Sequence, residues 1–228
     1  MKNGVILFCI IWTNLSALAQ PTSFAFRNIG INQGLSQSSV TDMTIDHLGF
    51  IWFATQDGLN RYDGKDFLIF KKNFDDITTP TGNRLGKIVE GDNNTIWLIT
   101  SGGKLESLNP NTSQFTTVTS VGQDVLGPVS CVLPQDSNHI WIGTEKNGLY
   151  LYKPLTKDFQ HFTNTSNTPL ALTSNTIQNI FRSSKKEFWI LTDKGLTLIT
   201  EHYAPGQSFL YEKFDDSTGI SCSTIDED

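Results

Sequence analysis

Apolar and polar positions along the chain form short strand-like segments that are separated by turn-forming residues. In the first such stretch, Val40 to Ile45 alternates in part, and Phe50 to Thr55 is dense in aromatic and β-branched residues. Asp57-Gly58 and Asp63-Gly64 are strong hairpin signals. The stretch therefore predicts four short antiparallel strands joined by tight turns: Val40–Ile45, Phe50–Thr55, Leu59–Tyr62 and Phe67–Phe70.

The same unit recurs with a period close to 45 residues. Four tryptophans past the first 19 residues are spaced by 45, 44 and 48 positions: Trp52, Trp97, Trp141 and Trp189. Each is followed by a threonine, a glycine and a leucine, and each is preceded twelve residues earlier by an aliphatic residue: Val40, Leu85, Val129 or Ile177. Four short strands repeated at this period are typical of a β-propeller blade.

The repeated tryptophans have a packing explanation. A four-stranded blade has two apolar faces that it cannot bury alone, so neighbouring blades must cover them. We therefore predict that the four tryptophans are core residues between blades, together with Phe53, Ile142 and Ile190, and we give a ligand-stacking role only as the alternative.

The register predicts an all-β, incomplete β-propeller with about four blades and the first strand of a fifth. Ile220 matches Val40, but a fifth tryptophan would fall at about position 232, beyond Asp228. Residues 20–34 contain a strand-like segment expected to complete the last blade, so we expect a piece of a longer chain; a natural four-bladed ring is the alternative. The predicted blades cover about 35–80, 81–124, 125–170 and 171–216, with the start of a fifth at 217–228.

Residues 1–19 are interpreted as a secretory signal peptide. Lys2 precedes the apolar run Val5 to Trp12, and Ala17-Leu18-Ala19 offers a small-residue cleavage site before Gln20. The apolar run is much shorter than the about 20 residues that a membrane-spanning helix needs. This predicts export from the cytoplasm, with a buried N-terminal helix or an anchor as the alternative.

Charge and cysteine usage narrow the partners. The formal net charge of -6 disfavours contact with nucleic acid or with anionic lipid. Cys131 and Cys222 hold equivalent positions in blades that are two apart, so we expect about 10 Å or more between them, beyond the about 7 Å Cα separation that a disulfide tolerates. Both are predicted to be free, half-buried thiols.

No catalytic or metal-binding constellation emerges from the sequence. The histidines are scattered, and none joins a cluster at zinc-ligand spacing: His47, His139, His161 and His202. Acidic pairs, a possible calcium turn and a glycine-rich turn are interpreted as ordinary loops: Asp75-Asp76, Asp215-Asp216, Asp92-Asn93-Asn94 and Gly102-Gly103-Lys104. We predict no catalytic residue, no metal and no cofactor, and we expect ligand contact through loops at one end of the propeller without assigning residues to it.

The first repeat closely resembles the two-component regulator propeller repeat. The resemblance lies in Gly34 to Val40, Gly49 to Thr55 and Asp57 to Gly64, and it is weaker in the later copies. Leu172 to Ile177 preserves the opening motif, whereas Ser101 to Lys104 departs from it by an extra residue before Leu105. The last copy also has a longer final loop.

The resemblance implies the periplasmic sensor region of a hybrid two-component histidine kinase of the Bacteroidetes type. Glycan-derived ligands, a second sensor copy as partner, phosphorelay signalling and transcriptional control would follow. The kinase domain is absent from these residues, so this chain itself is not expected to be an enzyme, and membrane contact is expected only through downstream segments in an inner-membrane protein. The alternatives are a secreted glycan-acting enzyme and an envelope scaffold or binding protein.

Overall fold

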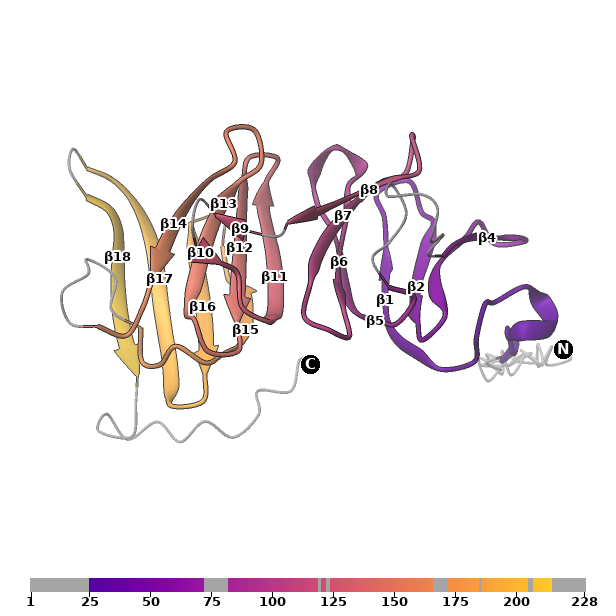
Figure 1. Ribbon diagram of the computed structural model, residues 1–228, viewed down its shortest axis with the longest axis horizontal. Coiled ribbons are helices and arrows are strands. Elements are labelled where there is room, and N and C mark those ends of the chain that lie inside the picture. The colour runs from indigo at the N-terminus through magenta and orange to yellow at the C-terminus, as the bar shows by residue number, and fades with distance from the viewer. Residues whose placement is uncertain are drawn as a thin grey trace, which may run out of the picture.

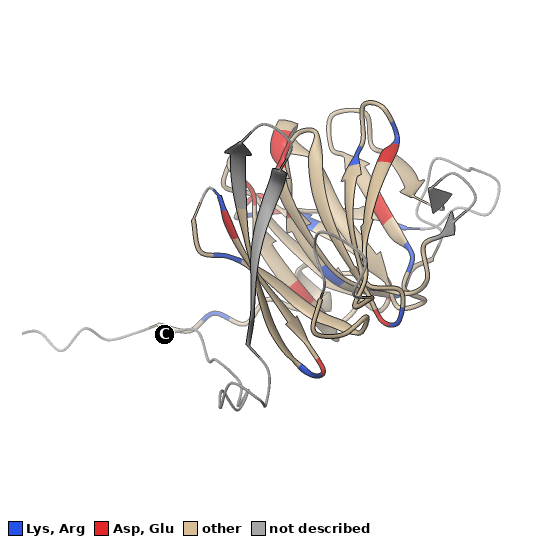
Figure 2. Ribbon diagram, turned by 90° about the vertical axis from the view of Figure 1, so that its left-hand side faces the viewer, with Lys and Arg blue, Asp and Glu red and all other residues tan. Residues whose placement is uncertain are grey.

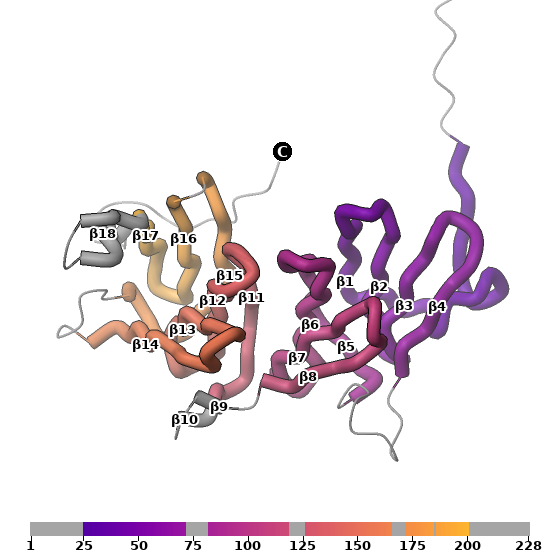
Figure 3. Tube along the Cα trace, turned by 90° about the horizontal axis from the view of Figure 1, so that it is seen from above, coloured from indigo at the N-terminus to yellow at the C-terminus, as the bar shows by residue number. Residues whose placement is uncertain are grey.

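The computed structural model describes residues 25–71, 82–118, 120–121, 124–165, 172–184, 186–204 and 207–214. Four four-stranded antiparallel sheets stand side by side as successive blades, each with its strands in chain order (Figure 1). Seen from above, the sheets form an arc that does not close (Figure 3). The prediction of an all-β, incomplete propeller is confirmed.

Each blade occupies one repeat. Blade 1 contains β1 (Val40–Ile45), β2 (Ile51–Thr55), β3 (Gly58–Tyr62) and β4 (Phe67–Phe70). Blade 2 contains β5 (Leu85–Glu90), β6 (Ile96–Thr100), β7 (Leu105–Asn109) and β8 (Gln114–Val118). Blade 3 contains β11 (Val129–Asp136), β12 (His139–Thr144), β13 (Leu149–Lys153) and β14 (Asp158–Phe162). Blade 4 contains β15 (Ile177–Arg182), β16 (Glu187–Thr192), β17 (Gly195–Ala204) and β18 (Gln207–Phe214).

Smaller elements lie outside the blades. They are the 3-10 turns η1 (Ile31–Gln33) and η2 (Asp92–Asn94) and a two-stranded sheet of β9 (Ser120–Val121) and β10 (Asp124–Val125). Residues 25–30 form no strand, and the Phe26 side chain is 95% exposed. The closing role of residues 20–34 stays a prediction, and so does the fifth repeat, which lies outside the described residues together with the signal peptide.

A bulge begins the first strand of every blade. The register of β1 with β2 shifts directly after Val40, and the first strands of the other blades shift at the equivalent place. Such a bulge re-aims the extra residue. In blades 1 and 3 that residue is hydroxylated: Thr41 Oγ1 donates to the carbonyl of Leu85 at 2.9 Å, and Ser130 Oγ donates to that of Ile177 at 2.6 Å. The bulge therefore links each of these blades to the next one.

Among the described residues, the hydrophobic core consists of three clusters, each between two neighbouring blades. Trp52 packs with Leu85 and Ile88 of blade 2, and its ring is fully buried. In the same way Trp97 meets Tyr152 of blade 3, and Trp141 meets Phe188 of blade 4. The prediction that the tryptophans lie between blades is confirmed for these three, and Ile142 and Ile190 are buried as predicted.

Two faces lie at the ends of the arc: the face of blade 1 that points away from blade 2, and the face of blade 4 that points away from blade 3. Their side chains are less buried than those of the faces between two blades. Alternation between buried and partly exposed residues appears in β2 and β16, whereas every residue of β6 is buried. Phe53 and Trp189 are accordingly only partly buried, which corrects their prediction as full core residues. Phe53 lies on the face of blade 1 that points away from blade 2, and Trp189 lies on the face of blade 4 that points away from blade 3, because side chains alternate between the faces of a strand.

Cys131 is fully buried rather than half-buried. It is a free thiol with 2% exposure, and it packs in the cluster that also contains Ile177 of the next blade. The sequence analysis underestimated the burial of Cys131 because the residue that packs over it, Ile177, belongs to the next blade and lies 46 positions later in the sequence. Cys222 lies outside the described residues.

The Cys131 thiol is expected to resist alkylation in the folded chain. Burial raises the pKa of this thiol to about 11, so the reactive thiolate is scarce at pH 8. Iodoacetamide labelling at pH 8, followed by peptide mass spectrometry, should leave Cys131 unmodified in native protein and label it quickly in denaturant. Labelling at equal rates in both states would show that blades 3 and 4 do not pack as described.

Candidate functional site

Much of the polar repeat motif serves to hold the blade together. The backbone N–H of Ser36 donates to Asn60 Oδ1 at 2.8 Å, and the hydroxyls of Ser36 and Thr55 lie 2.9 Å apart. The fourth repeat copies this arrangement, because the Thr173 N–H donates to Thr197 Oγ1 at 3.4 Å and the hydroxyls of Thr173 and Thr192 lie 2.7 Å apart. The opening motif therefore fastens the incoming segment to its blade.

The conserved-looking threonine and glycine of the repeat close the turn between the second and third strands. The hydroxyls of Thr55, Thr144 and Thr192 donate to the carbonyls of Gly58, Gly148 and Gly195 at 2.8, 2.7 and 2.9 Å. These three glycines have positive φ. A side chain at Gly58 would also come within 2.6 Å of the Phe70 carbonyl, so glycine is required there.

The histidines sit in structural contacts. His47 pairs with Glu90 across blades 1 and 2 at 2.7 Å, and His139 pairs with Asp136 of its own turn at 2.9 Å. His161 stacks on Tyr150, and the side chain of His202 lies outside the described part. Within the described ranges, no three His, Cys, Asp or Glu residues come together in a group that could hold a metal ion.

The remaining candidates of the sequence analysis lie only in part within the described residues. Asp92-Asn93-Asn94 forms the 3-10 turn η2, in which the Asn93 and Asn94 backbones adopt positive φ. Asp75-Asp76 and Asp215-Asp216 lie outside the described residues.

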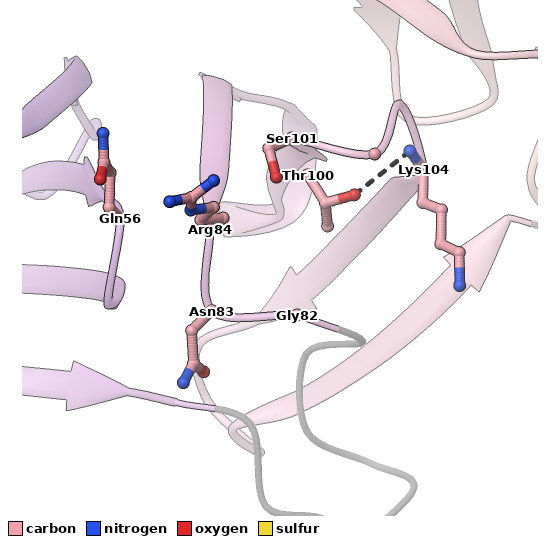
Figure 4. Close-up of a pocket in the computed structure, with 8 residues that line it drawn as sticks. Gln56, Gly82, Asn83, Arg84, Thr100, Ser101 and Lys104 are labelled. Carbon is pink, nitrogen blue, oxygen red and sulfur yellow. Dashed lines mark hydrogen bonds between the residues drawn. The ribbon is translucent and has the colours of Figure 1, made fainter.

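One cavity lies at the junction of blades 1 and 2. It is open to solvent, has a volume of about 420 Å³ and is bordered by the β2–β3 turn, the segment before β5 and the β6–β7 turn (Figure 4). All three segments lie at the same end of the blades. The sequence analysis expected ligand contact at one end of the propeller but did not say which end, so that expectation stays a prediction. The lining residues are Gln56, Gly82, Asn83, Arg84, Thr100, Ser101, Gly102 and Lys104.

Backbone hydrogen bonds hold the described walls of the cavity in place. The Gly58 N–H of blade 1 donates to the Asn83 carbonyl at 2.8 Å, and the Ser101 N–H donates to the Arg84 carbonyl at 2.9 Å. In the β6–β7 turn, the Thr100 N–H donates to the Lys104 carbonyl at 2.9 Å, and the Lys104 N–H donates to Thr100 Oγ1 at 3.3 Å. The described backbone around the cavity is therefore held in position by hydrogen bonds.

The cavity lining is basic although the chain is acidic. Many charged residues of both signs lie at turns and strand ends (Figure 2). Among the described residues that line the cavity, however, two have cationic side chains, Arg84 and Lys104, and none is Asp or Glu. The nearby turn residue Asp57 is already paired with Lys71 at 2.6 Å.

Comparison with known proteins begins at the level of the sequence. No family model matches the chain. A histidine kinase P4 of Formosa agariphila is 42% identical over 76 residues, which cover 33% of this chain and 5% of the kinase.

Solved structures show a more extensive similarity. The extracellular domain of the hybrid two-component system BT3049 of B. thetaiotaomicron matches with 26% identity and a TM-score of 0.65, covering 82% of this chain and 26% of that one. The WD40 repeats of RRP9 match in fold, with a TM-score of 0.54 at 11% identity, over 76% of this chain and 50% of that one. The chain thus spans about a quarter of the BT3049 domain.

The blades and the WD40 likeness define a β-propeller protein. Within that class, the chain resembles the extracellular domain of the hybrid two-component system BT3049 of B. thetaiotaomicron, which agrees with the repeat resemblance in the sequence. Along the described ranges, the structure contains no helix of the length and apolarity that a membrane crossing requires.

Proposed function

We propose that this chain forms part of the periplasmic ligand-sensing region of a hybrid two-component sensor histidine kinase, and that its ligand derives from glycans. The observation that carries the proposal is the similarity to the BT3049 extracellular domain over 82% of the chain, at 26% identity. The local match to a histidine kinase supports the same class. Kinase activity, phosphorelay and transcriptional control then belong to other parts of the full-length protein.

The proposal includes export and a larger propeller. A signal peptide at residues 1–19 would deliver the domain to the periplasm, and the full-length protein would sit in the inner membrane. The outer faces of blades 1 and 4 carry apolar residues of the kind that other blades bury, among them Met43 with 61% exposure and Ile45 with 64%. Further blades of the same repeat would cover them, as blade 2 covers Trp52.

Signalling would require that the ligand favours one of two arrangements of the sensor. A ligand shifts such an equilibrium only through its different affinity for the two states. We propose that a second sensor copy is the partner whose packing changes. If ligand saturation left the spacing and orientation of paired sensor domains unchanged, this part of the proposal would be wrong.

Ligand binding without turnover is the expected behaviour of the purified chain. A panel of oligosaccharides from dietary and host polysaccharides should contain at least one that raises the melting temperature, because a ligand present at 100 times its Kd adds about 2.7 kcal/mol to stability. Mass spectrometry of the same mixtures should show intact oligosaccharide after prolonged incubation. Cleavage products would favour a glycan-acting enzyme, and a panel without any binder would contradict glycan sensing.

A further inference from the structure

We infer that the cavity between blades 1 and 2 uses Arg84 and Lys104 to bind a small hydroxylated molecule that carries an oxyanion. The oxyanion would be a carboxylate or a sulfate group. The inference rests on the proposed ligand-sensing function and names the chemistry of the ligand. Four observations support it: the two cations depart from the repeat pattern, the described lining is positively charged, the cavity has the size of a small-molecule site, and hydrogen bonds fix its backbone walls.

The two cations occupy positions where the repeat does not require them. Arg84 directly precedes the first aliphatic residue of its blade, and the other blades have Ser39, Pro128 and Thr176 there. None of these is charged, so packing of the blade does not need a cation at this place.

Lys104 stands where the repeat has a glycine. The residue before the leucine of the third strand is Gly58, Gly148 or Gly195 in the other blades. Gly58 and Gly148 each donate their N–H to an asparagine carbonyl of the next blade, at 2.8 Å. Blade 2 instead contains an extended turn in which Gly103 accepts a bond from the Val129 N–H, also at 2.8 Å. The inserted residue thus makes room for a side chain in a turn that otherwise excludes one.

The charges in the cavity are not neutralised by a described neighbour. Across the described residues, neither Arg84 nor Lys104 is within ion-pair distance of a carboxylate. Both side chains are exposed, so they can reach a ligand in solution. Two cations with no acid among the described lining residues create a local positive potential on a chain whose net charge is -6, and an anion is the matching ligand.

The shape and the other lining groups add a second requirement. A volume of about 420 Å³ is within the range of small-molecule sites. In the close-up, Arg84 lies between Gln56 and Ser101, with Lys104 on the other side of Thr100 (Figure 4). The guanidinium can hold a carboxylate or a sulfate with two parallel bonds, whereas the Gln56 amide and the Ser101 hydroxyl suit ligand hydroxyls.

Isothermal titration of the full chain with glucuronate and with glucose tests the inference. The two sugars differ in the carboxylate, so glucuronate should bind and glucose should bind much more weakly or not at all. Arg84→Gln should weaken glucuronate binding about ten- to a hundredfold, and Lys104→Gln should weaken it by a smaller factor. Binding should also weaken between low salt and about 0.15 M salt, because ions screen exposed charges.

Matched controls separate this site from general charge effects. Arg27→Gln and Lys146→Gln make the same charge changes at exposed positions outside the lining, and Lys146 lies in the equivalent turn of blade 3. Neither should alter glucuronate affinity, and all four variants should retain the melting temperature of the unmodified chain. Inorganic sulfate should compete with glucuronate in the unmodified chain only if the oxyanion is the group that is recognised.

The outcomes distinguish the inference from the function on which it rests. Absence of glucuronate binding, or glucuronate binding that Arg84→Gln leaves unchanged, would overturn the oxyanion site. The proposed ligand-sensing function would survive either result if a neutral oligosaccharide from the wider panel still bound the Arg84→Gln variant. Equal affinity for glucose and glucuronate would overturn the site as well.

Discussion

Replacing Trp141 with alanine is expected to lower the free energy of unfolding by about 3–5 kcal/mol, the usual cost of removing a buried tryptophan. Its ring is fully buried between blades 3 and 4, where it packs against Phe162 and Phe188 at centroid distances of 5.7 and 5.6 Å. The change removes apolar contacts with both blades and leaves a cavity between the two sheets, which the sheets cannot fill by moving together. The loss should therefore appear in the cooperative unfolding of both blades.

Trp189→Ala is the matched control, because Trp189 occupies the same repeat position in blade 4. Its side chain is partly exposed, so less contact is lost and solvent already reaches the site. We expect this variant to lose less than half as much stability as Trp141→Ala. Urea unfolding followed by near-UV circular dichroism measures both variants. Equal losses would contradict the arrangement in which blade 4 has one uncovered face.

The architecture could be predicted from the sequence because the repeat determines it. Strand positions in blade 1 agree with the predicted ones to within one residue, since each strand is bounded by a strong turn signal such as Asp57-Gly58. The period of the tryptophans also revealed that blades pack face to face. Periodicity reports which positions have the same role, and a regular propeller gives equivalent positions nearly the same surroundings.

The same periodicity could not show which faces lack a neighbour. Phe53 and Ile142 are equivalent in the repeat, yet only Ile142 is buried, because blade 2 covers it and nothing among the described residues covers Phe53 in the same way. Burial of Cys131 was missed for a related reason: its cover comes from the next blade. Both errors concern how far a neighbouring blade covers a particular position, whereas the positions of the strands were anticipated.

The candidate site could not be assigned from the repeat, although a signal was present. Arg84 and Lys104 are visible as departures from the consensus of four copies, one replacing small or polar residues and the other replacing glycine. The sequence does not show that these two departures meet at one junction. That meeting depends on the β6–β7 turn of blade 2 folding back against the segment before β5, which the bond from the Ser101 N–H to the Arg84 carbonyl establishes.

Replacing Asp46 with alanine is expected to lower the free energy of unfolding by about 2–4 kcal/mol, because one buried and two partly buried donors lose their charged acceptor together. Asp46 is 4% exposed, and its carboxylate accepts the N–H groups of Leu48 and Phe50 at 3.1 and 2.9 Å. It also accepts the indole N–H of Trp52 at 2.7 Å. One side chain thus closes the β1–β2 turn and orients the buried tryptophan.

Gln135 offers the internal comparison, since it occupies the equivalent position in blade 3. Its Oε1 accepts the indole N–H of Trp141 at 2.9 Å, and the side chain is partly exposed. Gln135→Ala should cost about 1 kcal/mol, the net value of a typical hydrogen bond. Asp46→Asn should fall between the two, because the amide keeps one acceptor and presents its NH₂ group to a remaining donor. The urea midpoints of the three variants measure this order. If Asp46→Ala lowered the free energy of unfolding no more than Gln135→Ala, the carboxylate would not organise the turn.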